Sequence, residues 1–311
     1  MSRKGWILFA VMCVVWGIPY LLIKVAVGGV AVPVVVFART ALAAVILLPL
    51  AVRSGHLSTL RRHWLPLVAF TGLEVVGPWG LLSQAERQLP SSLAGLLVAA
   101  VPSIGVVIAK LTGGTERLGR WRWAGLVIGL AGVAVLAAPD LNRGSGWPIA
   151  EMLLVAVGYA SAPIIVARKL ADVPSMVLTA ACLTLAALVY APAAILNWPH
   201  WMPGSSVLAA LAALGVVCTA CAFITFFELI REVGTSRAMV FTYINPVVAV
   251  AAGVALLGES ISAAMVASFA LIIVGCLLAT RSERGQAAGE PAGPEAGSPR
   301  EASPRQRSSP G

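Results

Sequence analysis

A small set of ionisable side chains falls inside long apolar stretches of this sequence, where a charge is costly. They are Lys24, Arg39, Glu74, Glu151 and Glu228. Such groups bind ions or solutes, relay protons or pair with one another, so each is a candidate functional residue. No phosphate-binding loop, nucleophile elbow, HExxH zinc motif or dinucleotide fingerprint accompanies them. The sequence therefore predicts binding chemistry without enzyme activity, catalytic residues, metal or cofactor.

The cationic candidates have aromatic neighbours. Trp16, Tyr20 and Lys24 follow one another at steps of four residues, which places them on one face of a helix. This face could line a cavity for an anionic or zwitterionic group, or Lys24 could extend to the lipid headgroups. Arg39 lies too deep for that route; it could bind substrate or pair with an internal carboxylate, and we favour the internal partner. The predicted substrate pathway comprises Trp16, Tyr20, Lys24, Arg39, Tyr159, Tyr243 and Asn245.

The acidic candidates differ in depth. Glu74 lies well inside its stretch, where a carboxyl could carry a proton in exchange for substrate or serve as a hydrogen-bonded structural acid. Glu228 lies near the end of its stretch, and an ion pair with Arg231 is its simplest explanation. Both acids are coupling candidates and candidate partners of Arg39. Glu151 is expected to meet interfacial water.

The elements that hold these side chains must be membrane-spanning helices. The chain has 311 residues, of which 59% are hydrophobic and 11% are charged, whereas soluble domains are roughly half apolar and a quarter charged. The apolar runs are continuous rather than alternating, which favours helices over a barrel. The net charge of +9 does not indicate nucleic acid, because the cations lie in short loops where membrane topology needs them.

Windows of about 20 apolar residues predict ten spans. They cover about 6–27, 31–52, 64–84, 91–110, 121–139, 147–167, 174–196, 205–230, 237–257 and 261–280. With a cytoplasmic N-terminus, nearly all loop cations fall on the inner side, and the outer loops hold only Arg87 and Arg143. We therefore expect a multi-pass protein of the inner or plasma membrane with both termini in the cytoplasm.

The two halves of the chain match after a shift of 144 residues, which carries Pro19 onto Pro163 and Pro102 onto Pro246. The match predicts an all-α membrane protein of ten transmembrane helices in two inverted five-helix repeats, with a substrate site between them. The predicted divisions are a first repeat at 1–140, a second at 141–280 and a disordered cytoplasmic tail at 281–311.

Prolines and glycines within the spans predict where helices bend or approach closely. The prolines could act as paired hinges of a rocking mechanism or as tolerated packing kinks. They are Pro19, Pro78, Pro102, Pro163 and Pro246. The stretch GLVIGLAG at 125–132 presents small residues on one face, which favours close helix contact or a homodimer.

Three stretches resemble EamA-type proteins of the drug/metabolite transporter superfamily. VVWGIPYLLIKVAV at 14–27 and FARTALAAVILLPL at 37–50 resemble the first two spans of that family. FFELIREVGTSRAMVFTYINPVVAVAAGVALLGESIS at 226–262 is similar to the stretch joining spans eight to ten, with Pro246, Gly258 and Glu259 in place. GGTERLG at 113–119 departs from the Gly-Glu pair expected in the first half.

The resemblance implies a central cavity surrounded by spans one to four and six to nine, with spans five and ten peripheral. It also implies export, or less often uptake, of amino acids, other metabolites or drugs. We therefore predict a secondary transporter, expected to be an exporter, that works by alternating access with optional proton coupling. The alternatives are a non-transporting scaffold or sensor, and a transporter of drug-like cations.

The expected partners are a small-molecule substrate, the lipid bilayer and optionally a second copy of the chain. Lys24 and Arg39 favour a carboxylate-bearing solute over a bare cation. A concave cavity with Trp16, Lys24, Arg39 and Tyr243 in its wall would favour transport, whereas a solid core would favour a scaffold.

Overall fold

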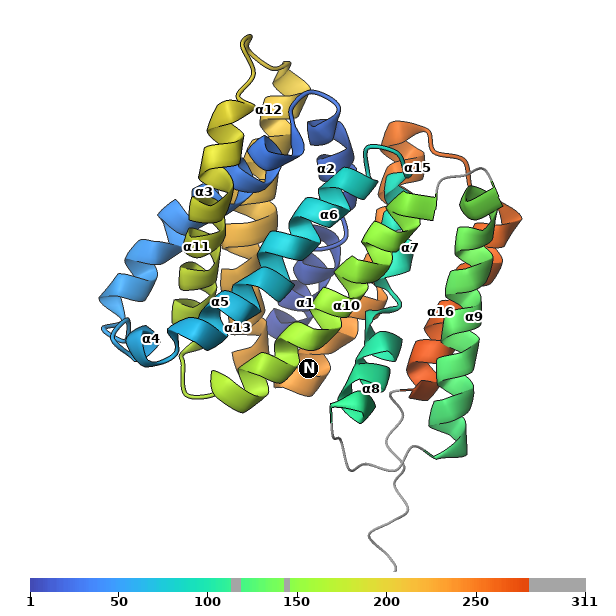
Figure 1. Ribbon diagram of the computed structural model, residues 1–311. Helices are drawn as coiled ribbons and strands as arrows, with labels where there is room; N and C mark the ends of the chain where they lie inside the picture. Colours follow the sequence, from blue (N-terminus) through green and yellow to red (C-terminus); the bar gives the residue numbers. More distant parts are fainter. Residues whose placement is uncertain (113–118, 143–145, 280–311) are drawn as a thin grey trace, which may run out of the picture. The chain divides into compact units, whose positions relative to one another are not determined.

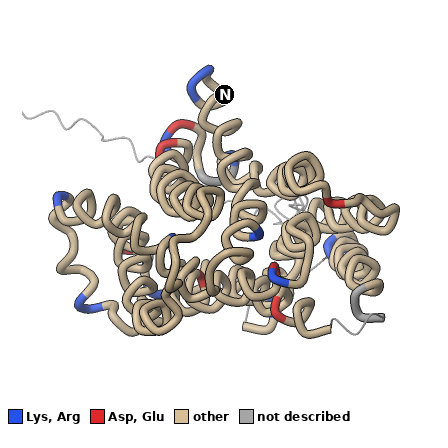
Figure 2. The backbone as a smooth tube through the Cα atoms, turned by 90° about the horizontal axis from the view of Figure 1, so that it is seen from above, with Lys and Arg blue, Asp and Glu red and all other residues tan. Residues whose placement is uncertain are grey.

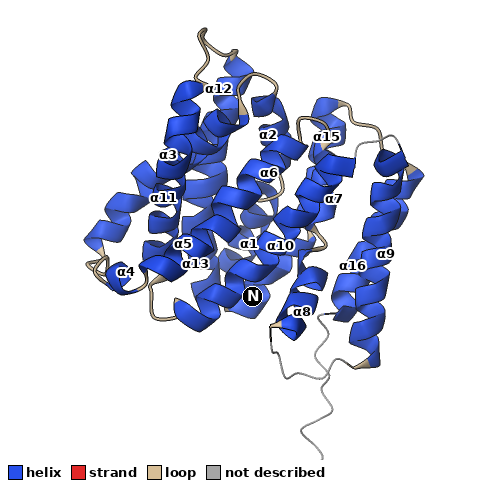
Figure 3. Ribbon diagram, viewed as in Figure 1, coloured by secondary structure: helices blue, strands red, loops and turns tan. Residues whose placement is uncertain are grey.

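The computed structural model describes residues 1–112, 119–142 and 146–279, and every regular element in those ranges is a helix (Figure 3). Eight helical stretches are long and apolar enough to cross a membrane, and two further apolar helices, Asn245–Leu257 and Ala263–Ala279, are shorter. The eight are Arg3–Val27, Val32–Arg53, Trp64–Ala85, Ser91–Leu111, Arg120–Pro139, Gly146–Lys169, Ser175–Leu196 and Ser205–Val233. Each predicted window therefore holds a helix, while residues 113–118, Arg143 and the 281–311 tail lie outside the described residues.

Several of the stretches consist of two or three helical segments (Figure 1). The first half contains α1 (Arg3–Val15), α2 (Pro19–Val27), α3 (Val32–Arg53), α4 (Thr59–Arg62), α5 (Trp64–Thr71), η1 (Gly72–Val76), α6 (Gly77–Ala85), α7 (Ser91–Val98), α8 (Val101–Leu111) and α9 (Arg120–Asn142). The second half contains α10 (Gly146–Lys169), α11 (Ser175–Leu196), α12 (Ser205–Ala212), η2 (Ala213–Cys221), α13 (Ala222–Val233), α14 (Thr235–Ala238), η3 (Met239–Tyr243), α15 (Asn245–Leu257) and α16 (Ala263–Ala279).

Two of the segmented stretches contain π-helical turns. In the first, η1 ends just before Pro78, which has no amide proton for the Glu74 carbonyl and whose ring would clash with it in a regular helix. The wider turn of η1 accommodates this missing bond. In the second, η2 contains no proline, and the Thr219 hydroxyl donates a hydrogen bond of 2.7 Å to the Leu214 carbonyl. Each π segment lies in the middle of its stretch.

Most of the predicted kink residues lie at helix starts. Pro19, Pro78, Pro102 and Pro246 each occupy the first or second position of a helix, where no amide donor is needed. Pro163 instead lies inside α10 without ending it. The matched breaks expected at Pro19 and Pro163 are therefore not found, whereas Pro102 and Pro246 each follow a break in a helix.

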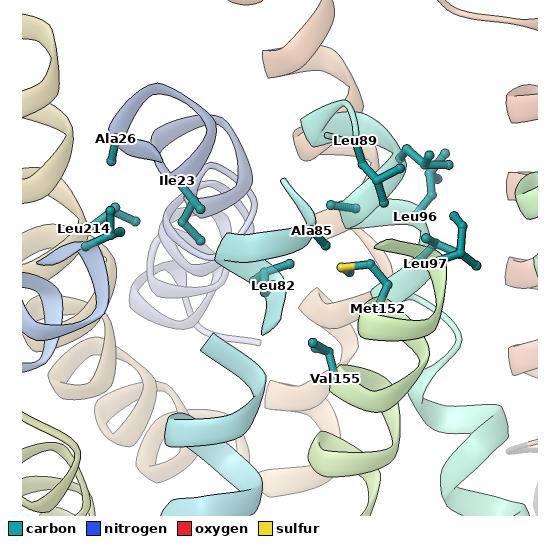
Figure 4. Packing of buried hydrophobic residues seen from close by; sticks show 14 of the residues in the cluster. Ile23, Ala26, Leu82, Ala85, Leu89, Leu96, Leu97, Met152, Val155 and Leu214 are labelled. Carbon is teal, nitrogen blue, oxygen red and sulfur yellow. The ribbon is translucent and has the colours of Figure 1, made fainter. Parts of the chain in front are cut away.

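Helices of the two halves pack against one another in matched pairs. Helix α3 packs on α11, α7 on α15 and α9 on α16, so each of these elements contacts its predicted equivalent in the other half. The main apolar core forms where other helices meet. Figure 4 shows Ile23, Leu82, Leu97 and Met152, from α2, α6, α7 and α10, among the side chains that fill it.

The glycine face of α9 meets α16 within the same chain. A Cβ atom on Gly275 would lie 2.5 Å from the Gly129 Cα and 2.7 Å from the Gly125 carbonyl oxygen, so the two backbones touch directly. Figure 1 shows the two helices side by side. The predicted close contact is confirmed, and because α16 covers this face, a homodimer would need another surface.

Candidate functional site

Arg39 on α3 is buried, with 8% of its surface exposed. Its Nε donates a 2.9 Å hydrogen bond to the Thr219 hydroxyl on η2, and its guanidinium carbon lies 3.6 Å from the ring centroid of Trp79 on α6. A cation–π contact of this kind contributes about 2 kcal/mol when desolvated. Within the described ranges no carboxylate forms an ion pair with Arg39. The expected pairing with Glu74 or Glu228 is therefore wrong.

Two tyrosines lie near this arginine. Tyr20 on α2 and Tyr159 on α10 both interact electrostatically with Arg39 and with each other. The structure thus brings together three predicted pathway residues from different helices of both halves. A guanidinium group beside phenolic hydroxyls can hold an oxyanion such as a carboxylate, because all of these groups donate hydrogen bonds.

Lys24 caps the end of α6. Its Nζ donates hydrogen bonds of 2.6 Å to the Glu86 carbonyl and 2.8 Å to the Leu89 carbonyl. A cation in this position satisfies carbonyl groups that have no partner within the helix and complements the negative end of the helix dipole. The ammonium group is therefore held by the protein, an arrangement that neither the cavity nor the headgroup alternative anticipates.

Trp16 belongs to an aromatic cluster, defined here as Trp16, Phe223, Phe226 and Phe241. The ring centroid of Trp16 lies 5.5 Å from Phe223, 5.1 Å from Phe226 and 5.3 Å from Phe241. These residues come from the α1–α2 turn, α13 and η3. Since the helix breaks after Val15, Trp16 joins this cluster while Tyr20 lies near Arg39.

Glu228 forms ion pairs near the end of α13. Its carboxylate lies 2.5 Å from Lys4 Nζ and 3.5 Å from the Arg231 guanidinium, and its side chain is 38% exposed. The predicted pairing with Arg231 is confirmed, and the contact with Lys4 ties α1 to α13. Charged residues are sparse along the described chain, as the long tan stretches in Figure 2 show.

The other two acids have fewer partners. Glu74 lies on η1 near Tyr159 and Cys182, and no hydrogen bond or ion pair joins its carboxylate to the rest of the described chain. Glu151 is only 3% exposed, and one carboxyl oxygen has no hydrogen-bond partner within the described ranges. The expectation that Glu151 meets interfacial water is therefore wrong, because its position on α10 turns it inward.

Tyr243 and Asn245 flank the break between η3 and α15. Tyr243 packs against the main apolar core, and the side-chain oxygen of Asn245 is buried without a hydrogen-bond partner among the described residues. Buried amide oxygens normally have a partner. Asn245 therefore marks a polar point in the ninth predicted span, and no hydrogen bond connects it to Arg39.

Glu259 has a role that its sequence position does not reveal. Its carboxylate accepts hydrogen bonds from the Ser91 amide at 2.7 Å, the Ser91 hydroxyl at 3.0 Å and the Ser92 amide at 2.9 Å. It thereby caps the N-terminus of α7. Burial acts to raise the pKa of Glu259, but the hydrogen bonds from Ser92 and Ser91 outweigh it and hold the pKa below its usual value. In the sequence, the Pro-Ser-Ser stretch at 90–92 indicates a helix start that needs a cap, but it does not indicate that Glu259 provides the cap.

Two hollows in the structure are almost entirely apolar. One, of about 240 Å³, lies between α3 and α11, and the other, of about 260 Å³, lies among α7, α15 and α16. Neither is lined by Trp16, Lys24, Arg39 or Tyr243. The central cavity expected from the sequence is therefore not confirmed by these hollows.

Known proteins resemble this chain over most of its length. Residues 3–138 and 146–281 each match the EamA-like transporter family. The protein named "Uncharacterized inner membrane transporter YedA" of Escherichia coli strain K12 is 29% identical over 283 residues, covering 88% of this chain and 89% of its own. "Uncharacterized transporter YvbV" of Bacillus subtilis strain 168 is 25% identical over 295 residues, covering 91% and 93%. A protein of known crystal structure, 25% identical, covers 90% of this chain and 98% of its own with a TM-score of 0.63.

Proposed function

The chain belongs to the EamA-like transporter family, and on that premise we propose that it is a secondary transporter of small carboxylate-bearing solutes such as amino acids. It is a multi-pass membrane protein whose relatives are named as transporters. The observation that carries the substrate class is the burial of Arg39 without a carboxylate partner in the described part of the chain.

A buried cation needs a counter-charge. Desolvating an ammonium- or guanidinium-sized ion costs several kcal/mol even after relaxation, and the contacts of Arg39 with Thr219 and Trp79 offset only part of this. A substrate carboxylate would complete the site by accepting bidentate hydrogen bonds from the guanidinium group. Tyr20 and Tyr159 would orient the remainder of the solute.

We further propose that the halves 1–140 and 141–280 are inverted repeats that alternately open a shared pathway. Three observations support this arrangement: the family matches each half separately, equivalent helices pair with each other, and each half has a π segment within its third span. The distribution of loop cations supports cytoplasmic termini. We propose that the protein exports its solute and that protons enter the cell in exchange.

The aromatic cluster supports a closed end for this pathway. Trp16 contacts Phe223, Phe226 and Phe241. The Lys4–Glu228 ion pair links α1 to α13, the helix that carries Phe223 and Phe226. Opening this end would separate these groups, so we assign them to the gate on the N-terminal side.

Counterflow of labelled amino acids and organic acids into proteoliposomes tests the proposal. Wild type should accumulate at least one carboxylate-bearing solute, and Arg39→Gln should lose this activity. Arg87→Gln is the control, because Arg87 is exposed and should leave counterflow unchanged. If only drug-like cations move, the substrate class is drug-like cations and not carboxylate-bearing solutes. If a folded, inserted protein moves no solute at all, a scaffold is favoured.

A further inference from the structure

Glu86 is a buried acid that the transport pathway described above does not use. It follows α6 directly, its residue exposure is 0%, and neither carboxyl oxygen has a hydrogen-bond partner in the described ranges. Desolvating an ionised carboxylate costs several kcal/mol even after the protein relaxes. An unsatisfied neutral polar group costs only about 1–3 kcal/mol. We therefore expect the group to be neutral and to carry a proton at neutral pH.

The charged groups around Glu86 act on it without forming an ion pair. Lys24 on α2, Arg39 on α3 and Glu259 after α15 all interact with it electrostatically. The ammonium of Lys24 is bound by the Glu86 and Leu89 carbonyl oxygens instead of the carboxyl group. Glu259 keeps its own negative charge on the amides at the start of α7. Two neighbouring acids thus hold opposite protonation states, which is the arrangement that separates proton carriers from fixed charges.

Water cannot reach Glu86 while the helices around it stay packed. Ala85 and Leu89, on either side of it in the sequence, lie in the main apolar core with Leu97 and Met152 (Figure 4). Leu97 comes from α7 and Met152 from α10, and these two helices belong to different halves of the chain. Because α6 also packs on α10, we expect exposure of the carboxyl group to accompany movement between the halves, which would link protonation to conformation.

We propose that Glu86 is the proton-binding site that couples proton movement to the conformational cycle of the transporter. This inference rests on the proposed function. In the conformation described, the carboxyl group carries the proton, and the Lys24 ammonium donates hydrogen bonds to the Glu86 and Leu89 carbonyl oxygens. When the halves move apart, the carboxyl O–H bond breaks and the proton passes to water. The Lys24 ammonium, already bonded to the backbone of the same residue, then becomes the partner of the carboxylate.

The electrostatic setting agrees with this assignment. Burial raises the pKa of the Glu86 carboxyl well above its usual range, the charge of Lys24 opposes the rise, Glu259 adds to it and Arg39 opposes it. Ionisation therefore needs either solvent or closer approach of Lys24. Both come from the same helix movement, so release of the proton and opening of the pathway occur together.

Infrared difference spectroscopy on the full chain in lipid nanodiscs at neutral pH tests whether Glu86 holds a proton. The spectrum of wild type minus that of Glu86→Gln should contain a carboxylic acid carbonyl band that shifts in heavy water. Glu228→Gln is the control, because its exposed carboxylate should produce no such band. Should Glu86→Gln fail to fold, Glu86→Asp should keep the acid band at a displaced frequency. The inference would be overturned if the wild-type spectrum contained no carboxylic acid band that is lost in Glu86→Gln or displaced in Glu86→Asp.

Proton movement in proteoliposomes separates failure of this inference from failure of the proposed function. With a trapped pH indicator and a solute that wild type moves, Glu86→Gln should retain counterflow but lose at least about tenfold in solute-driven proton movement. If Glu86→Gln moves protons as fast as wild type does, the proposed role of Glu86 is refuted, while the proposed transport function still stands. If wild type moves no solute, the proposed function fails, and the infrared band still decides whether this carboxyl group holds a proton.

Discussion

Removal of the Glu259 carboxylate is expected to loosen the start of α7. The carboxylate satisfies two backbone amides, those of Ser91 and Ser92, and these residues are only 0% and 1% exposed. A buried donor left without a partner costs about 1–3 kcal/mol. Glu259→Ala should therefore lower the free energy of unfolding by about 2–6 kcal/mol, and Glu259→Gln, which keeps one acceptor oxygen, by about half as much.

Thermal unfolding in detergent micelles, followed by tryptophan fluorescence, measures this loss. Because the folded-state pKa of Glu259 is depressed, its contribution is fully present above the unfolded pKa of roughly 4.3 and disappears as the pH falls through the folded value. The gap between wild type and Glu259→Ala should therefore be constant near neutral pH and close in acid. Equal stability at neutral pH, or a gap that widens in acid, would refute the capping role.

A second variant tests the same contact from the opposite side. A Cβ atom at Gly253 would meet the Glu259 carboxylate and lie 2.9 Å from the Ser91 hydroxyl. Gly253→Ala should therefore displace the carboxylate and reproduce much of the Glu259→Gln defect. Gly72→Ala is the matched control, because no atom lies within 4 Å of its added methyl group.

The remaining predictions concern substrate binding, the gate and helix packing. Arg39→Lys keeps the charge but loses the planar stack and the Nε hydrogen bond, so the KM of counterflow should rise about tenfold, the equivalent of roughly 1.4 kcal/mol. Trp16→Ala should open the aromatic cluster and speed maleimide labelling of the buried Cys13, measured with Cys221→Ser in both proteins. Gly275→Ala should lower the free energy of unfolding by about 1–3 kcal/mol, read by thermal unfolding, because the added carbon meets the backbone of α9.

The features predictable from the sequence depend on neighbours that are close along the chain. Continuous apolar runs define the helices, the spacing of three residues predicts the Glu228–Arg231 pair, and small residues at 125–132 predict a close helix contact. Each of these patterns repeats within one helix, so no knowledge of the tertiary arrangement is needed.

The partners of the central residues could not be predicted, because they come from distant parts of the chain. Arg39 binds the hydroxyl of Thr219, a small residue in an apolar run, and stacks on Trp79, which is equally consistent with simple core packing. Lys24 binds backbone carbonyls, which every residue possesses and no sequence pattern marks. Glu86 stands beside Arg87 and has the sequence context of a loop, although the fold buries it completely.

The capping contact of Lys24 also constrains the order in which the protein is assembled. The ribosome delivers α1 and α2 to the membrane before the Glu86 and Leu89 carbonyls have been synthesised. During that interval neither carbonyl is available to the ammonium group, and we expect its long side chain to extend to the headgroups. When α6 is inserted, the Glu86 and Leu89 carbonyl oxygens replace the lipid headgroups as partners of the ammonium group. We therefore expect the lysine to anchor α2 at the membrane surface first and to join α2 to the end of α6 later.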